Sequence, residues 1–297
     1  MFFIFYRFNA VLKAIVLVFA SQSIQVLGQS ILLPPVNIKI PSELTVEEII
    51  EKAREASKRN GQGDTAFKFY RKASFDELDS KGNIIEKNSK TYRAYTDDRD
   101  QRLRKINGRT ATREERYREY RKHQERQRRY LNKRKNGDSR KKNESLFTRN
   151  IDLFEDKFIP VLEGVEKVND RDAFIIGLKP NKKNRYKSNT VNRIMDQLQT
   201  KVWIDKDEFQ ISQISARLIK PVNFLGGIAG SIKTINIDAT QKRLGKDNWV
   251  DEKVNAQFNA RIAWKTYQFR MESLSTKFEL IERNKPDSQE SVRLFTR

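Results

Sequence analysis

The chain has 297 residues, with 60 Lys and Arg against 39 Asp and Glu, and a formal net charge of +21. It contains no cysteine, which excludes disulfides, thiol catalysis and cysteine-ligated zinc. The only histidine, His123, lies in a run of charged residues, where the buried and oriented imidazole of a Ser-His-Asp triad is not expected. No carboxylate spacing singles out an acid–base pair. The sequence therefore favours a non-enzymatic protein without a cofactor or a metal.

Residues 1–28 are predicted to be a secretory signal peptide. Arg7 and Lys13 supply positive charge before the short apolar run 14–20, and a cleavage position follows Gly28. The run is much shorter than the roughly 20 apolar residues that span a bilayer. We expect cleavage and a periplasmic or extracellular mature protein; an uncleaved N-terminal anchor is the alternative.

The first elements of the mature chain are predicted to be a helix and a hairpin. Thr45 and Glu48 have the spacing of a capping box, which indicates a helix from Val46 up to the glycine at 61. From Thr65 the pattern changes to that of strands, and the polar cluster 79–83 predicts the turn of a hairpin.

A strongly basic segment follows, which we assign as an insertion over residues 112–145. A second capping box at Thr112 opens a helix, and from Arg113 to Lys142 there are fourteen basic and five acidic residues, an excess of nine. One interpretation is a solvated helix whose Glu and Arg side chains pair with each other; the other is a functional basic surface. The residues that would contact an anionic surface are Arg113, Arg121, Lys122, Arg128, Arg129, Lys133, Arg134 and Lys135.

The next stretch mixes short helices and strands. Apolar residues at helical spacing predict short helices or a turn-rich cap over 146–165, and two strands flank the polar turn 169–172. Val191 to Leu198 is predicted to be a short amphipathic helix. Lys206-Asp207 separates strands 202–205 and 209–218, the second with a bulge between Ile211 and Ile214. The polar tail 283–297 is expected to be disordered.

The most regular pattern lies in residues 251–269, after a glycine-rich loop. Every second residue from Val254 to Trp264 is apolar, which predicts a strand with one buried face. Small and large side chains alternate on that face, as in a curved sheet or one that leaves space for a ligand. An ordinary packed core is the alternative. The predicted cavity-lining residues are Ala256, Phe258, Ala260, Ile262 and Trp264.

The order of several short motifs resembles a known family. The motifs are Val202-Trp203-Ile204-Asp205 before a polar turn, Asn169-Asp170-Arg171-Asp172-Ala173-Phe174 ahead of Leu178-Lys179-Pro180, Gly226-Gly227, and Asn248-Trp249-Val250. From about Thr45 to Ile281 the chain resembles the periplasmic lipoprotein carriers LolA and LolB, and more closely secreted bacterial proteins called outer-membrane lipoprotein-sorting proteins. The resemblance implies an α+β fold over residues 29–282. Its strongly curved, unclosed antiparallel β half-barrel would have helices covering the concave side, around an apolar cavity for lipid chains.

Two functions follow as expectations. The first is a secreted or periplasmic protein that holds a lipid or acylated ligand in the half-barrel, in outer-membrane lipid or lipoprotein handling. The second is an envelope-surface or scaffold protein that binds anionic lipid, lipopolysaccharide or polysaccharide through the basic segment. The positive charge would also suit nucleic acid, but the export signal argues against that partner.

Overall fold

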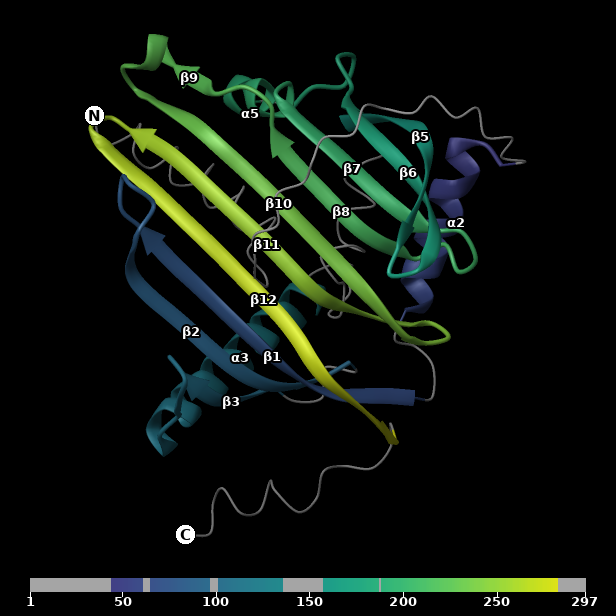
Figure 1. Ribbon diagram of the computed structural model, residues 1–297, viewed down its shortest axis with the longest axis vertical. Coiled ribbons are helices and arrows are strands. Elements are labelled where there is room, and N and C mark those ends of the chain that lie inside the picture. Colours follow the sequence, from purple (N-terminus) through teal and green to yellow (C-terminus); the bar gives the residue numbers. More distant parts are fainter. Residues whose placement is uncertain (1–43, 61–64, 97–100, 136–156, 187, 283–297) are drawn as a thin grey trace.

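The computed structural model describes residues 44–60, 65–96, 101–135, 157–186 and 188–282, and its main feature is one open antiparallel sheet (Figure 1). β9 (Val222–Phe224) pairs only with β10, and the two outer strands, β4 and β5, do not pair with each other. The other strands run in the order β4 (Arg109–Thr110), β3 (Gln101–Ile106), β2 (Ile84–Tyr95), β1 (Thr65–Leu78), β12 (Lys265–Glu282), β11 (Asn248–Ile262), β10 (Gly230–Gly245), β8 (Ile211–Leu218), β7 (Leu198–Asp205), β6 (Arg171–Pro180) and β5 (Phe158–Val168). The predicted α+β fold with an unclosed, curved sheet is confirmed.

The helices begin where the capping signals predict. In α2 (Val46–Arg59) the Thr45 hydroxyl accepts from the Glu48 amide, and the Glu48 carboxylate accepts from the Thr45 amide at 2.7 Å. Thr112 and Glu115 make the same exchange at the start of α3 (Arg113–Lys135). The short helix α5 is Asn189–Met195, and a 3-10 turn, η1, is Leu225–Gly227.

Both long helices lie on the same face of the sheet. Directly paired residues on neighbouring strands point to the same side. One such cross-strand row runs from β11 to β2 and consists of Val254, Ser273, Ala73 and Lys90. Val254 is buried with residues of α2, and Lys90 donates to Glu119 of α3. We call this side the covered face; in Figure 1, α2 stands at the β5–β8 part of the sheet and α3 at the β1–β3 part.

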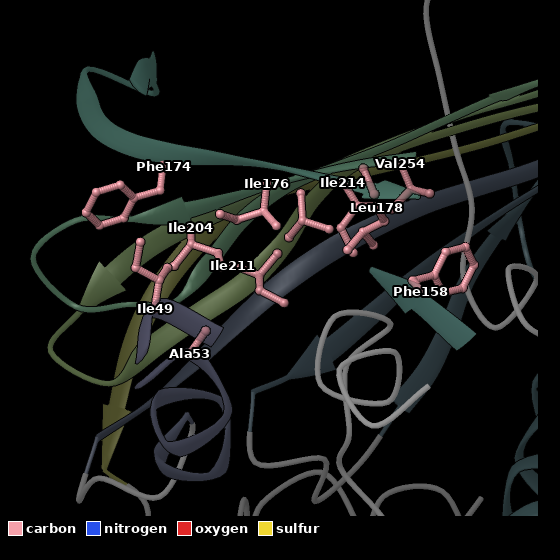
Figure 2. Close-up of a cluster of buried hydrophobic side chains, with 12 residues drawn as sticks. Ile49, Ala53, Phe158, Phe174, Ile176, Leu178, Ile204, Ile211, Ile214 and Val254 are labelled. Carbon is pink, nitrogen blue, oxygen red and sulfur yellow. The ribbon is translucent and has the colours of Figure 1, made fainter. Parts of the chain in front are cut away.

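The core is concentrated at the α2 half of the sheet. Ile49 and Ala53 of α2 are buried against side chains of β5 to β8, β10 and β11 (Figure 2). A second cluster joins Ile194 of α5 to β10 and β11, where Phe258 and Ala260 belong to it. The apolar side chains of β11 thus face the core, as the alternation in the sequence predicts.

The predicted turns at 79–83 and 206–207 and the predicted bulge are confirmed, but two bounds differ. The strand expected from Phe209 begins at Ile211, since Phe209 adopts a φ of 55°, and the turn expected over 169–172 is shorter because β6 begins at Arg171. Residues 79–83 connect β1 to β2, and residues 206–210 connect β7 to β8. Ile204 pairs with Ile211 while Trp203 pairs with Gln213, so Ser212 is the extra residue of the bulge.

Three sequence predictions need correction. Phe158 opens strand β5 rather than continuing a helix, and Leu198 opens β7 after α5 has ended. In both places the apolar run is shorter than about ten residues, so its spacing fits the period of a helix as well as that of a strand. The strand that contains Val254 ends at Ile262, because Ala263 adopts a φ of 52° in a two-residue turn, and Trp264 lies in that turn.

Several predicted segments lie outside the described residues. These are the signal peptide 1–28, the glycines expected to end the first helix, residues 136–156 and the tail 283–297.

Ile49→Ala should lower the free energy of unfolding by about 2–5 kcal/mol, because it removes a fully buried side chain that joins α2 to the sheet. Urea unfolding measures this change. Ile159→Ala, at an exposed position of β5, is the matched control and should cost much less. Equal losses would show that α2 does not anchor the core.

Candidate functional site

The covered face carries a strip of apolar side chains that are only partly buried. We call this strip the apolar floor; it consists of Phe75, Ala256, Tyr267, Phe269 and Met271. The Phe75 and Phe269 rings lie 5.0 Å apart between centroids, and those of Tyr267 and Phe269 lie 6.4 Å apart. The floor crosses β1, β12 and β11 in the centre of the sheet, between the α5 cluster and α3.

Cross-strand pairing explains how the floor joins the core. One row of paired residues runs from β1 to β10 and consists of Phe75, Met271, Ala256 and Ile237. The exposed fraction is 38% at Phe75, intermediate at Met271 and Ala256, and 6% at Ile237. A neighbouring row joins Phe269 to Phe258. The floor is thus the more exposed continuation of a buried apolar surface.

The five residues predicted to line a cavity are not all in one environment. Ala256 belongs to the floor, and Ile262 is half-buried at the end of β11. Phe258 and Ala260 are packed inside the second core cluster, with Ala260 at 0% exposure. Trp264 lies in the turn after β11 and is 80% exposed, so the structure separates it from the other four. The floor residues Phe269 and Met271 were missed because the register of β12 on β11 places them beside Ala256, and Phe75 was missed because the register of β1 on β12 brings it next to Met271.

Two acidic residues of the basic helix α3, Glu115 and Glu119, pair with residues of the sheet. Glu119 accepts from Lys90 Nζ at 2.8 Å and from the Tyr92 hydroxyl at 3.2 Å. Burial raises the pKa of Glu119, but the hydrogen bond and the charge of Lys90 outweigh it, so this pKa is lowered. Glu115 forms a bidentate pair with Arg109 of β4, and these hydrogen bonds hold the pKa of Glu115 at about 2.

The opposite side of α3 exposes basic and aromatic residues. Arg113, Arg118, Arg121, Lys122 and Arg128 are exposed, as are Tyr117 and Tyr120. Within α3, Arg121 and Glu125 form an ion pair at 4.0 Å. Glu115 and Glu119 pair with residues of the sheet, whereas Glu125 pairs within the helix, so the described residues leave both interpretations of this segment open. Arg129, Lys133, Arg134 and Lys135 belong to α3, but their side chains are not among those described.

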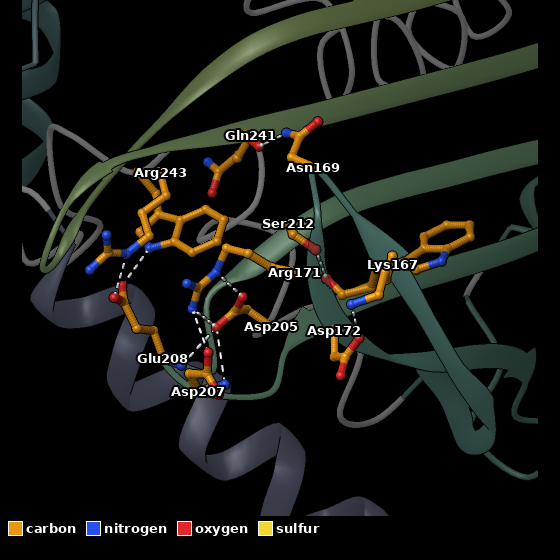
Figure 3. Close-up of polar contacts among 12 residues, drawn as sticks. Lys167, Asn169, Arg171, Asp172, Asp205, Asp207, Glu208, Ser212, Gln241 and Arg243 are labelled. Atoms are coloured by element: carbon orange, nitrogen blue, oxygen red, sulfur yellow. Dashed lines mark hydrogen bonds and ion pairs between the residues drawn. The ribbon is translucent and has the colours of Figure 1, made fainter.

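A polar network closes one end of the sheet (Figure 3). The Arg171 guanidinium donates to both oxygens of Asp205, at 2.6 and 2.9 Å, and to Asp207 at 3.0 Å. The hydrogen bonds with Asp205 raise the pKa of Arg171. Asp205, only 1% exposed, also accepts from the backbone amides of Asp207 and Glu208 in the β7–β8 turn.

The same network reaches β11 and α2. Glu208 accepts from the Trp249 indole at 2.8 Å and pairs with Arg243. Asn60, which caps α2, exchanges two hydrogen bonds with the Trp249 backbone. The motifs that carry the family resemblance around Arg171, Asp205 and Trp249 thus meet in space. Each carboxylate of the network has a partner, so the cluster joins turns together and does not form an open site.

The described residues contain no group of three His, Cys, Asp or Glu side chains placed to hold a metal ion. Among the same residues, no helix combines the length and the apolar character needed to cross a bilayer.

Comparisons with known proteins give similarities of fold. No protein-family model matches the chain, and neither does any curated protein. Among solved structures, a LolA superfamily protein from Nitrosomonas europaea matches 86% of this chain and 98% of its own, at 13% identity and a TM-score of 0.30. A domain described as an outer membrane lipoprotein-sorting protein from Vibrio parahaemolyticus matches 84% and 99%, at 12% identity and a TM-score of 0.31. A DUF1329 family protein from Desulfovibrio piger matches 83% and 98%, at 10% identity and a TM-score of 0.29. The resemblance predicted from the sequence motifs is thus found again among solved structures, as a likeness of fold alone.

Arg171→Leu should lower the free energy of unfolding by about 3 kcal/mol, because it leaves the buried Asp205 carboxylate without its charged partner. Asp207→Asn, at a carboxylate that is 78% exposed, should change it by less than about 0.5 kcal/mol. Chemical denaturation measures both. Similar losses in the two variants would contradict the role assigned to the Arg171–Asp205 pair.

Glu119→Gln should weaken the attachment of α3 at neutral pH by about 1 kcal/mol. The folded-state pKa of Glu119 is lowered from 4.5, so its stabilising contribution is present above pH 4.5 and is lost as the pH falls through the folded-state value. The stability difference between wild type and variant should therefore shrink on acidification. A difference that stays constant down to pH 3 would be evidence against this ion pair.

Proposed function

We propose that this is a non-enzymatic, exported protein that binds a lipid or an acylated ligand on the apolar floor. The observation that supports this proposal is the exposure gradient along the row Phe75, Met271, Ala256 and Ile237. Apolar side chains exposed side by side on the helix-bearing face of a sheet favour contact with an apolar partner. An acyl chain laid on this row would remove the exposed parts of Phe75 and Met271 from water.

The half of the sheet under α2 and α5 offers no comparable surface in the described residues. There the same face is occupied by packed side chains such as Ile49, Ile194 and Phe258. We therefore propose that the ligand binds over β1, β12 and β11, at the floor. A role in outer-membrane lipid or lipoprotein handling is the physiological context that we propose for this activity.

Phe269→Ser and Met271→Ser should each weaken the binding of a fluorescent fatty acid to delipidated protein by about tenfold, because each removes apolar contact area. Titration of probe fluorescence gives the Kd. The matched control is Leu274→Ser, which changes an exposed apolar residue of the same strand on the opposite face and should leave the Kd unchanged. No saturable binding of any acyl probe to wild-type protein would overturn the proposal.

Two alanine substitutions separate the floor from the packed core. Ala256→Leu adds volume at a half-buried floor position, so it should reduce probe uptake with little change in Tm. Ala260→Leu adds the same volume at a fully buried position and should destabilise the protein by about 1–3 kcal/mol through overpacking. If Ala256→Leu destabilises the protein as much as Ala260→Leu, the floor is ordinary core.

A second candidate function is binding of anionic lipid, lipopolysaccharide or polysaccharide by α3. The observation that favours it is the inward orientation of Glu115 and Glu119, which leaves an outer side rich in Arg and Lys. The triple change Arg118→Gln, Lys122→Gln and Arg128→Gln should weaken binding to anionic vesicles at low salt and flatten its salt dependence. Unchanged salt dependence would remove this candidate.

A further inference from the structure

Large apolar side chains are exposed at one end of the sheet, where three connections lie near each other (Figure 1). Ile228 is 85% exposed between η1 and β10, and Trp264 is 80% exposed in the β11–β12 turn. Ile84 and Ile85, exposed just after the β1–β2 turn, lie at the same end. The described turns at the opposite end instead expose polar residues such as Asp170, Lys206 and Asp207. The connections around Ile228 and Trp264 are therefore candidates for contact with an apolar partner.

Hydrogen bonds link the turn that carries Ile228 to the turn that carries Trp264. Arg261 donates to the Gly227 carbonyl at 2.6 Å and to the Ala263 carbonyl at 2.8 Å. The Ala263 amide donates to the Ala229 carbonyl at 3.1 Å. Gly230 has a φ of 149°, and a Cβ atom there would lie 2.4 Å from the Arg261 carbonyl oxygen, so only glycine permits this close approach. The backbones of the two turns are therefore held together, so less backbone entropy is lost when this end of the sheet binds a partner.

We propose that Trp264 and Ile228 insert into the interfacial region of a lipid bilayer and dock this end of the sheet on a membrane surface. We call the two residues the apolar tip. Side chains that project from turns penetrate a soft interface, whereas a protein partner would have to provide a matching hollow. Tryptophan is enriched at the headgroup level of membranes because its indole has an apolar body and a polar edge.

The charge around the apolar tip is complementary to an anionic leaflet. Lys265 follows Trp264 directly and is exposed, with its ammonium 5.0 Å from the Tyr267 ring centroid. The whole chain carries a net charge of +21. Basic residues beside an inserted apolar group add electrostatic attraction to an anionic bilayer.

Docking by the tip would bring the apolar floor to the membrane. Tyr267, the floor residue nearest the β11–β12 turn, lies three positions after Trp264. The inference itself does not depend on the proposed acyl ligand, because the tip is defined by its own exposure and by the contacts of Arg261.

The tryptophan content of the chain permits a direct test. Trp203 and Trp249 are buried, and their indoles donate to Glu166 and Glu208 at 3.0 and 2.8 Å. A change of tryptophan emission on binding to vesicles therefore reports on Trp264. With vesicles of mixed phosphatidylcholine and phosphatidylglycerol, we expect a blue shift and quenching by lipids brominated on their acyl chains.

Three variants, checked for native circular dichroism, decide the outcome. Trp264→Phe should still sediment with the vesicles but lose the emission shift. The double variant Trp264→Ser and Ile228→Ser should bind at least tenfold more weakly. The control Leu280→Ser, an exposed apolar position toward the other end of β12, should bind like wild type. These measurements need no acyl probe, so their failure is distinguishable from failure of the proposed function.

The proposal is overturned by absence of vesicle binding, or by bound protein in which brominated acyl chains do not quench Trp264. It is also overturned if the double variant binds as well as wild type, as it would if α3 alone held the protein on the vesicle.

Discussion

One face of this sheet carries the two main apolar clusters, and the two long helices lie on it by different means. α2 places Ile49 and Ala53 into the core, so its half of the sheet is closed by close packing. α3 meets the other half through Glu119, which contacts Lys90 and Tyr92. A helix held by polar contacts along one line buries little apolar surface. The floor between them therefore remains partly exposed, and the functional proposals depend on this imbalance.

The two ends of the sheet also differ, because polar contacts dominate one end and exposed apolar side chains the other. At one end, charge-assisted hydrogen bonds of Asp205 and Glu208 join three turns, and neutral hydrogen bonds between Asn60 and the Trp249 backbone add the end of α2. At the other end Arg261 joins turns that expose apolar side chains. The first arrangement leaves its polar groups satisfied within the protein. The second leaves apolar area in water, which is stable only if that area is small or meets a partner.

Features that depend on neighbouring residues could be predicted from the sequence. The capping boxes at Thr45 and Thr112, the turn at 206–207 and the bulge after Ile211 each have a local signature and are found in the structure. Features that depend on strand pairing could not. The floor exists because Phe75 pairs with Met271, nearly 200 residues away in the chain. Likewise, the inward orientation of Glu119 requires Lys90 of β2, and the position of Trp264 depends on the left-handed conformation of Ala263.

The most direct test of the account is to map where an acyl chain lies on the protein. A fatty acid carrying a photoreactive diazirine near its methyl end can be crosslinked to wild-type protein and located by peptide mass spectrometry. The account predicts crosslinks to Tyr267, Phe269 or Met271 of β12 and to Phe75 of β1, all on the covered face. Crosslinks concentrated on the opposite face, around Leu274, or no crosslinks competed by unlabelled fatty acid, would contradict it.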